Sequence, residues 1–392
     1  MRVLLAATST LPDHMGGSQR VVWELARGLV ARGHAPMIVV PRTAGGPAES
    51  VHQGITVRRY HDPWHAFAAL YLPSVLLARA ALRRAARDWS ADLVHAHHGI
   101  SGLGAARAHL GPRCYTFYGP WHLQLLAESA TRRDRPAVTR WARRAWTPSK
   151  TALTRRIERA ALRASARPVV LSRYSARQLE TIHGVPAART TIVPGGVDLD
   201  RFRPAAGRGA PRHALGLAAS GPLVFTARRL VPDMGLEGLI EAMAALPGVR
   251  LVVGGDGWLR PRLVAQVMHL GLVDRVTFAG FIPEEALPLY YQAADLVVMP
   301  SVALEGFGLI ALEALACGTP MVATADCGVV DVLEPLEPSW IAADASPAAL
   351  ARTIGPALEA VAGDPSVFAR CRGHAETYPW SRMVEAYEAL YR

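Results

Sequence analysis

The feature that most constrains the fold is a repeated alternation of short apolar runs with helical patterns. In the first half of the 392 residues, the apolar runs are RVLLAA (2–7), APMIVV (35–40), ADLVHAHH (91–98) and RCYTFYG (113–119). In the second half, they are PLVFTARRL (222–230), VRLVVGGDG (249–257), VTFAGF (276–281), ADLVVMPS (294–301) and TPMVATA (319–325). Runs of this length between helices predict parallel strands with crossover connections. We therefore predict an α/β protein of two Rossmann-like, doubly wound domains that face a central, ligand-binding cleft.

A change in charge marks the predicted domain boundary. Residues 1–190 carry 28 Lys and Arg against 10 Asp and Glu, a net charge of +18, whereas residues 191–392 carry 15 against 22, a net charge of −7. Pro194, Gly195 and Gly196 interrupt the pattern at the same place. We predict an N-terminal domain over 1–190 and a C-terminal domain over 191–375, with a helix in 376–392 crossing back to the first domain.

Composition excludes several classes of protein. With 51% hydrophobic and 19% charged residues, the chain is predicted to be globular and not disordered. The four cysteines have no CxxC spacing, so we expect reduced, structural thiols. No apolar run approaches the roughly 20 residues of a membrane-spanning helix, and the first apolar run is too short for a signal peptide. We therefore expect a cytoplasmic protein.

The segment EGFGLIALEALACGTP (305–320) carries two carboxylates, Glu305 and Glu313, around a glycine-rich loop. We predict that a helix begins at about Phe307 or Gly308, so that the amides of Phe307, Gly308 and Leu309 bind a phosphate. Eight helical residues span at most ~12 Å, about the distance from ribose to sugar ring in a nucleotide-diphosphate sugar. Glu313 lies in an otherwise apolar helix, where a charge is seldom left without a partner.

These segments, taken in order, resemble the family-four retaining glycosyltransferases of the GT-B fold. PSVALEGFGLIALEALACGTPMVAT (300–324) is similar to the carboxylate-x7-carboxylate signature of that family. MGGSQRVVWELARGLVARGH (15–34), DLVHAHH (92–98), IVPGGVDLDRFRP (192–204) and VTFAGFIPEEALPLYYQAADLVVMPS (276–301) resemble its other segments. The resemblance covers nearly the whole chain. It implies an enzyme that moves a sugar from a nucleotide-diphosphate sugar to an acceptor hydroxyl, with no metal and no cofactor.

The resemblance also implies roles for individual residues. Glu305 would contact hydroxyls of the donor sugar, and Glu313 those of the ribose. Arg229 and the amides that follow Glu305 would stabilise the diphosphate. The full set of donor-binding positions is Gly16, Gly17, Arg228, Arg229, Met234, Ile282, Glu305, Gly306, Phe307, Gly308, Leu309 and Glu313.

Two positions depart from the family pattern. The R-L-x-x-x-K-G motif reads RLVPDMG here, with Met234 in place of the lysine. Either Arg228 supplies the second charge, or the diphosphate is held more weakly. Tyr118 stands where the family often has histidine beside the reacting sugar. Together with Glu305 and Arg229, it completes the set of catalytic candidates. Trp121 and His122 are candidates on the acceptor side.

Other functions were weighed against this interpretation. Asp198 and Asp200 mimic a metal-binding DxD motif, but their position beside the domain boundary disfavours a metal role. The arginine-rich segment 131–167 could be a solvated helix face or, because of Trp141 and Trp146, a surface for membranes; no motif supports nucleic-acid binding. We expect the acceptor to be a small molecule, a saccharide or a lipid-linked precursor, from secondary metabolism or the cell envelope. The rivals are a sugar-nucleotide epimerase and a catalytically weak partner subunit.

Overall fold

The computed structural model describes residues 1–392 except 12, 14–15, 43–45, 64–70, 112 and 132–136, and it describes only the backbone of helical residues 128–131 and 137–147. The chain divides into two compact units. Unit 1 comprises Met1–Gly195 and Trp380–Arg392, and unit 2 comprises Gly196–Pro379. The observed division lies within six residues of the predicted boundaries at 190 and 376.

Unit 1 contains an eight-stranded sheet in the order β3-β4-β2-β1-β5-β6-β7-β8, in which only β3 runs antiparallel to its neighbour. Its strands are β1 (Arg2–Ala6), β2 (Ala35–Pro41), β3 (Glu49–His52), β4 (Ile55–Tyr60), β5 (Leu93–Ala96), β6 (Cys114–Phe117), β7 (Arg167–Val170) and β8 (Thr191–Ile192). Its helices are α1 (Gly17–Ala31), α2 (Tyr71–Trp89), α3 (Gly99–Arg107), α4 (Trp121–Thr131), α5 (Ala137–Ala164), α6 (Arg173–His183) and α15 (Trp380–Tyr391), with a 3-10 turn at Ala187–Arg189.

Unit 2 contains a six-stranded, parallel sheet in the order β11-β10-β9-β12-β13-β14. Its strands are β9 (Leu223–Ala227), β10 (Arg250–Gly254), β11 (Val276–Gly280), β12 (Leu296–Met299), β13 (Met321–Thr324) and β14 (Ile341–Ala342). Its helices are α7 (Gly209–Ala214), α8 (Leu236–Ala242), α9 (Arg260–His269), α10 (Leu287–Ala293), α11 (Leu309–Ala316), α12 (Val330–Leu333), α13 (Pro347–Gly363) and α14 (Val367–Ala375). Short 3-10 turns lie at Pro232–Met234, Met243–Ala245 and Pro338–Trp340.

Both sheets have doubly wound topology. In unit 2 the strands follow the spatial order 3-2-1-4-5-6, which is the order of the dinucleotide-binding fold. Unit 1 shows the same order in β4-β2-β1-β5-β6-β7, extended by β8 at one edge and by the antiparallel β3 at the other. The central strands are buried on both faces, as expected for parallel strands covered by helices. The predicted fold class is therefore confirmed.

The nine apolar runs singled out in the sequence all contain strands. The sequence analysis missed β3, β4, β7, β8 and β14. Strand β4 alternates buried and half-buried residues and lies towards the edge of the sheet, so it lacks a continuous apolar run.

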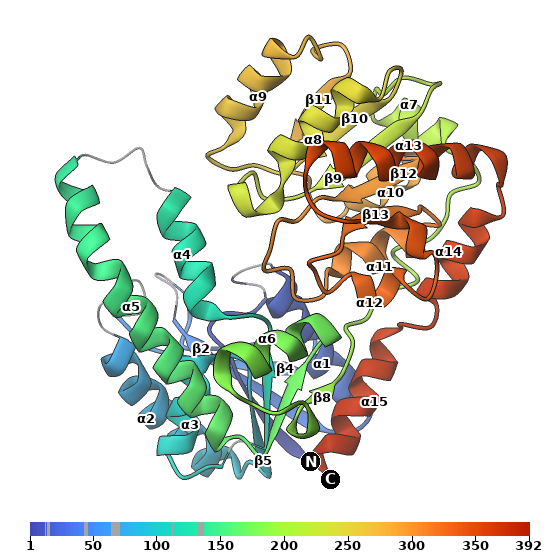
Figure 1. Ribbon diagram of the computed structural model, residues 1–392. Coiled ribbons are helices and arrows are strands. Elements are labelled where there is room, and N and C mark those ends of the chain that lie inside the picture. The colour runs from blue at the N-terminus through green and yellow to red at the C-terminus, as the bar shows by residue number, and fades with distance from the viewer. Residues whose placement is uncertain (12, 14–15, 43–45, 64–70, 112, 132–136) are drawn as a thin grey trace. The chain divides into compact units, whose positions relative to one another are not determined.

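Helix α15 completes unit 1 although unit 2 separates it from the rest of that unit in the sequence (Figure 1). It packs on α1, where the side chain of Val384 fills the space left by Gly28. The guanidinium of Arg32 donates to Glu388 at 2.6 Å and holds the pKa of that carboxyl down at about 2. Two buried tyrosines of α15 bond to the central strands: the Tyr391 hydroxyl lies 2.7 Å from His95, and the Tyr387 hydroxyl lies 2.8 Å from Thr116.

Candidate active site

The sheet of unit 2 places the loops that follow β9 and β12 side by side at its topological switch point. Strands β9 and β12 are neighbours, and the direction in which successive strands are added reverses between them. Ligands of doubly wound folds bind outside the carboxyl ends of strands at such a point. Arg228 and Arg229 follow β9 directly, and Glu305 lies six residues after β12.

Arg228 is buried and makes an ion pair with Glu305. The Nη2 atom donates to the Glu305 Oε2 at 2.8 Å, and the same guanidinium lies 2.8 Å from the Met234 sulfur. Arg228 is only 7% exposed, and its Nη1 atom is buried with no hydrogen-bond partner in the described part of the chain. The positive charge at this point of the structure therefore comes from Arg228, beside the thioether of Met234.

The loop before α11 is held in a constrained backbone conformation. Leu304 has a φ of 65°, which is unusual for a bulky residue and typical of functional sites. Gly308 has a φ of 79°, and a Cβ there would lie 2.2 Å from the Val329 side chain. Helix α11 begins at Leu309, one or two residues after the predicted start at Phe307 or Gly308, and Gly308 is its N-cap. The amides of residues 307–309 therefore lie at the start of this helix.

Glu313 lies on the buried face of α11 and is 5% exposed. Its Oε2 atom accepts a hydrogen bond of 3.0 Å from the hydroxyl of Tyr291 on α10. The prediction that this carboxylate has a partner is confirmed. Because the side chain is buried, Glu313 is also part of the packing between α10 and α11, which the sequence did not indicate.

The remaining donor-side candidates of unit 2 lie near these groups in the sequence but differ in exposure. Arg229 is exposed, and among the described residues its guanidinium has no hydrogen bond or ion pair. Ile282 is partly buried and follows β11. Gly306 is partly buried, and Phe307 is buried. Asp198, part of the DxD-like sequence, accepts hydrogen bonds from the amides of Asp200 and Arg201 and so forms a local turn.

In unit 1, Gly16 and Gly17 lie at the start of α1, which follows β1. Gly16 is the N-cap, and its carbonyl accepts from the Arg20 amide at 2.9 Å. Gln19, on the same turn, donates to Ser9 at 2.7 Å. The glycines therefore lie at the carboxyl end of β1, beside the switch point between β1 and β5 in this sheet.

Tyr118 follows β6 and contacts a histidine that the sequence analysis did not single out. Its hydroxyl lies 2.9 Å from Nδ1 of His97, which follows the neighbouring strand β5. Burial lowers the pKa of His97 to about 3 and raises the pKa of Tyr118 well above its usual value. Both side chains are therefore neutral near pH 7. The carboxyl ends of adjacent parallel strands meet, so the histidines that end DLVHAHH were the signal for this contact.

Trp121 and His122 start α4 but have different surroundings. The ring of Trp121 lies 4.4 Å from that of His98, the N-cap of α3, and 4.7 Å from that of Tyr71. Trp121 is half-buried in this aromatic group. His122 is 9% exposed and lies beside Glu158 and His183, two residues that the sequence analysis did not single out.

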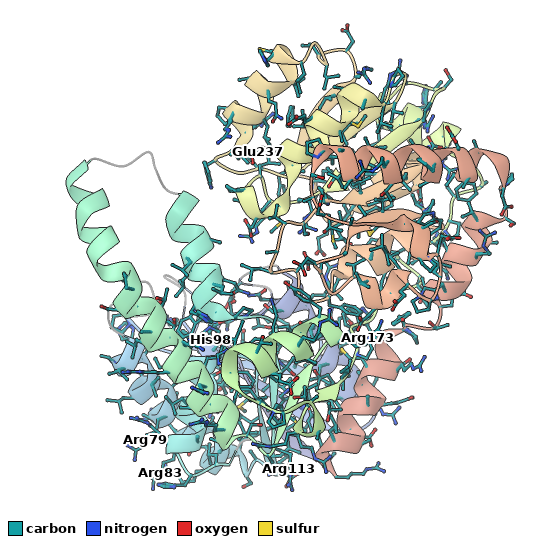
Figure 2. All side chains as sticks on the ribbon, viewed as in Figure 1. Arg79, Arg83, His98, Arg113, Arg173 and Glu237 are labelled. Carbon is teal, nitrogen blue, oxygen red and sulfur yellow. The ribbon has the colours of Figure 1, made fainter. Side chains whose placement is uncertain are left out.

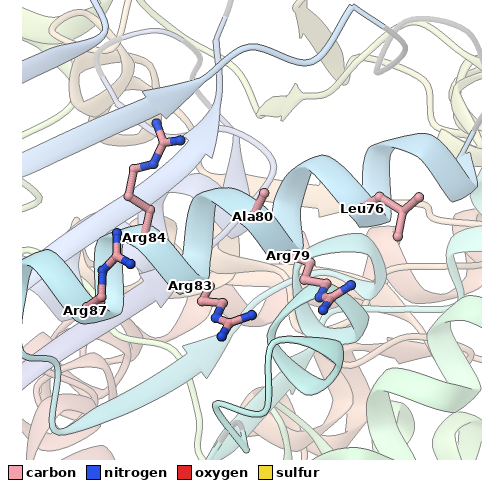
Figure 3. Close-up of a pocket in the computed structure, with 6 residues that line it drawn as sticks. All are labelled: Leu76, Arg79, Ala80, Arg83, Arg84 and Arg87. Atoms are coloured by element: carbon pink, nitrogen blue, oxygen red, sulfur yellow. The ribbon is translucent and has the colours of Figure 1, made fainter.

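An arginine-lined hollow lies on α2, at the outer edge of unit 1 (Figures 2 and 3). Its lining residues follow a helical period of three to four: Leu76, Arg79, Ala80, Arg83, Arg84 and Arg87. Leu76, one turn before Arg79, and Leu72, two turns before it, are about half exposed, at 51% and 49%. The side chains of Trp141 and Trp146, in the basic segment singled out above, are outside the described residues. Among the helices that are described, none has both the length and the apolar composition to cross a bilayer.

Comparison with known proteins agrees with the fold. Residues 15–201 match the family model described as Glycosyltransferase Family 4, and residues 210–360 match Glycosyl transferases group 1. A D-inositol 3-phosphate glycosyltransferase of Mycolicibacterium paratuberculosis is 33% identical over 100% of this chain and 90% of its own length. The corresponding protein of Mycolicibacterium gilvum is 37% identical over 226 residues, which are 56% of this chain and half of that protein.

Solved structures give the same result for the fold. Sucrose-phosphate synthase from Thermosynechococcus elongatus aligns with a TM-score of 0.82 and 25% identity, covering 100% of this chain and 98% of that one. WaaG, a glycosyltransferase of lipopolysaccharide biosynthesis, aligns with a TM-score of 0.73 and 19% identity over 98% of both chains. Two doubly wound units with these neighbours define a GT-B, nucleotide-sugar-dependent glycosyltransferase. The chain belongs to glycosyltransferase family 4.

Proposed function

We propose that this glycosyltransferase moves a sugar from a nucleotide-diphosphate sugar to an acceptor hydroxyl with retention of anomeric configuration and without a metal ion. The observation that carries the proposal is the buried Arg228 guanidinium, paired with Glu305 at the switch point of unit 2. Its Nη1 atom is buried without a hydrogen-bond partner among the described residues, which supports a role in binding an anionic ligand. Structures of a relative in the fold, HepE of Anabaena, are described as complexes with UDP and with UDP-glucose.

The donor would be held at three points of unit 2. Glu313 would accept from the ribose hydroxyls while keeping its bond to Tyr291, since a carboxylate accepts several hydrogen bonds. The amides at the start of α11, together with Arg228 and Arg229, would bind the diphosphate. Glu305 would accept from hydroxyls of the transferred sugar, and its ion pair with Arg228 fixes the position of the carboxylate before the donor binds.

The chemical step would depend on charge that develops on the leaving diphosphate. Fixed donors aimed at that charge stabilise the transition state more than the ground state. The departing phosphate oxygen would take the proton of the acceptor hydroxyl, so that no protein nucleophile is needed. Tyr118 would donate a hydrogen bond near the reacting sugar, because its hydroxyl is neutral and is oriented by His97.

For the acceptor we propose an anionic cyclitol, with a phosphorylated inositol as the first compound to test. The relatives that span most of this chain are described as D-inositol 3-phosphate glycosyltransferases. Residues 1–190, which form nearly all of unit 1, carry a net charge of +18, which favours an anionic acceptor. A saccharide or a lipid-linked precursor would be the alternative acceptor.

Product analysis tests the proposal. The purified chain is first screened with UDP-, GDP- and ADP-sugars for thermal stabilisation, and the stabilising donor is then incubated with and without inositol phosphate. We expect a glycosylated inositol phosphate of retained configuration, identified by NMR. Conversion of the sugar nucleotide without acceptor would indicate an epimerase, and donor binding without any turnover would indicate a partner subunit.

We also propose that the α2 surface, formed by Leu72, Leu76, Arg79, Arg83, Arg84 and Arg87, rests on anionic membrane. Two half-exposed leucines in line with arginines on one helix are the features of an interfacial helix. The protein should sediment together with vesicles of phosphatidylglycerol and should stay in the supernatant with vesicles of phosphatidylcholine. Arg83→Glu with Arg87→Glu should release it, whereas the exposed Arg352→Glu on α13 should not. Equal release by the control variant would contradict the assignment.

A further inference from the structure

A buried cluster in unit 1 contains the donor atoms of a metal site. His122 starts α4, Glu158 lies on α5, and His183 ends α6, so three helices contribute one residue each. The three side chains are 9%, 3% and 0% exposed. A ring nitrogen of each histidine and a carboxylate oxygen of Glu158 all lie within 4.8 Å of one another.

The hydrogen bonding of the cluster is incomplete. Within the described part of the chain, Nδ1 of His122 and both ring nitrogens of His183 are buried without a hydrogen-bond partner. Nε2 of His183 lies 3.1 Å from the Glu158 Oε2, within the distance of an ion pair. Buried polar atoms without partners are uncommon and indicate a missing ligand or a functional role.

The spacing of the three donor atoms is close to that of ligands around a shared ion. Bonds of 2.0–2.1 Å in a tetrahedral site separate ligand atoms by roughly 3.4 Å. Closing the present spacing requires a movement of about 1.4 Å or less for the most distant pair, which side-chain rotation supplies.

The surrounding contacts keep the three helices close together. The Glu158 Oε2, the oxygen beside His183, also accepts from the Trp121 amide at 3.3 Å, which ties α5 to the start of α4. Arg159 donates to the His183 carbonyl at 3.0 Å, and Arg155 donates to the Ile182 carbonyl at 2.9 Å. Both guanidinium groups are bonded to the backbone at the end of α6, so neither occupies the space between the two histidines and the glutamate.

We propose that His122, Glu158 and His183 bind a zinc ion that joins α4, α5 and α6. Two imidazoles and one carboxylate form a donor set that suits Zn²⁺, with water as the fourth ligand. This site is separate from the donor-binding residues of unit 2, and the proposal does not depend on which sugar or acceptor the enzyme uses.

Metal titration of the full chain tests the proposal without an activity assay. After chelation with EDTA and removal of the chelator, wild-type protein should bind one equivalent of Zn²⁺, measured by calorimetry and elemental analysis. Co²⁺ should give the visible absorption bands of a tetrahedral complex. At a zinc concentration of 100 times Kd, the melting temperature should rise by ~5–10 °C.

Substitutions locate the site. His183→Ala and Glu158→Gln should each weaken Zn²⁺ binding at least about 100-fold, as loss of one ligand from a three-residue site requires. His213→Ala, which removes an exposed histidine of unit 2, should bind as the wild type does. Circular dichroism of each variant in EDTA separates loss of a ligand from loss of folding.

Absence of stoichiometric binding in the wild-type protein would overturn the proposal, whatever the variants do. Zinc binding of equal strength in the wild type and in a folded His183→Ala variant would do so as well, because it would place the ion elsewhere on the surface.

Discussion

The contact between Arg228 and Met234 leads to a prediction about moving the positive charge from one position to the other. In the family motif a lysine occupies the Met234 position, whereas here the Arg228 guanidinium lies against the Met234 sulfur and bonds to Glu305. If Arg228 has taken over the lysine's charge, the two positions should be interchangeable only as a pair. Arg228→Gly alone should weaken nucleoside-diphosphate binding, and Arg228→Gly with Met234→Lys should restore it.

The magnitudes follow from the contacts. Loss of one hydrogen bond from a charged group costs about 1.5–3 kcal/mol, which is roughly a 10- to 150-fold rise in Kd. For Met234→Lys alone, two positive charges at ~4 Å repel by about 4 kcal/mol at an effective dielectric constant of 20. Rotation of the lysine towards solvent relieves most of this repulsion, so we expect an affinity that is unchanged or lower, by up to tenfold.

Calorimetry measures the Kd of the nucleoside diphosphate for the wild type, the two single variants and the double variant, using the nucleotide of the donor found in the thermal screen. Arg352→Ala, which removes an exposed arginine on α13, serves as the control. We expect the double variant to bind within about threefold of the wild type. A gain of tenfold or more in Met234→Lys alone would refute the exchange of roles. Unchanged affinity in every variant would show that the diphosphate does not bind beside this loop.

Three further predictions concern the carboxylates, metal dependence and pH. Glu313→Gln should raise the Kd of the free nucleoside diphosphate, whereas Glu305→Gln should leave that Kd nearly unchanged and lower turnover of the intact donor; equal loss of nucleotide binding would contradict this division. Glu313→Ala should also lower the free energy of unfolding by about 1–3 kcal/mol in denaturant titration, because the Tyr291 hydroxyl loses its bond to the carboxylate. EDTA should leave initial rates of transfer largely intact. A loss of activity that Mg²⁺ reverses would instead support a metal-binding role for Asp198. Burial lowers the pKa of His97 to about 3, so its contribution to stability is fully present above the unfolded value of ~6.5 and is lost as the pH drops towards 3. The loss from His97 should reach about 2 kcal/mol at pH 5, and His97→Gln should remove that part of the profile.

The sequence predicts the parts of this molecule that depend on local pattern. The apolar runs identify the central strands because a parallel strand buried on both faces needs a continuous run. The partner of Glu313 could be expected but not named, since Tyr291 lies on another helix. Arg228 could be proposed as a substitute for lysine, but its pairing with Glu305 depends on β9 and β12 being neighbours. The cluster of His122, Glu158 and His183 has no sequence motif, because helix packing alone brings these three residues together.

Helix α15 has a consequence for how this chain is made. Unit 1 is interrupted by the 184 residues of Gly196–Pro379, and the hydroxyls of Tyr387 and Tyr391 complete the hydrogen bonds of β5 and β6 only when α15 docks. Domains usually fold in order of synthesis, the N-terminal one first. Here the sheet of unit 1 emerges from the ribosome long before α15, the helix that covers it. Unit 2 can therefore reach its final structure before unit 1 is complete.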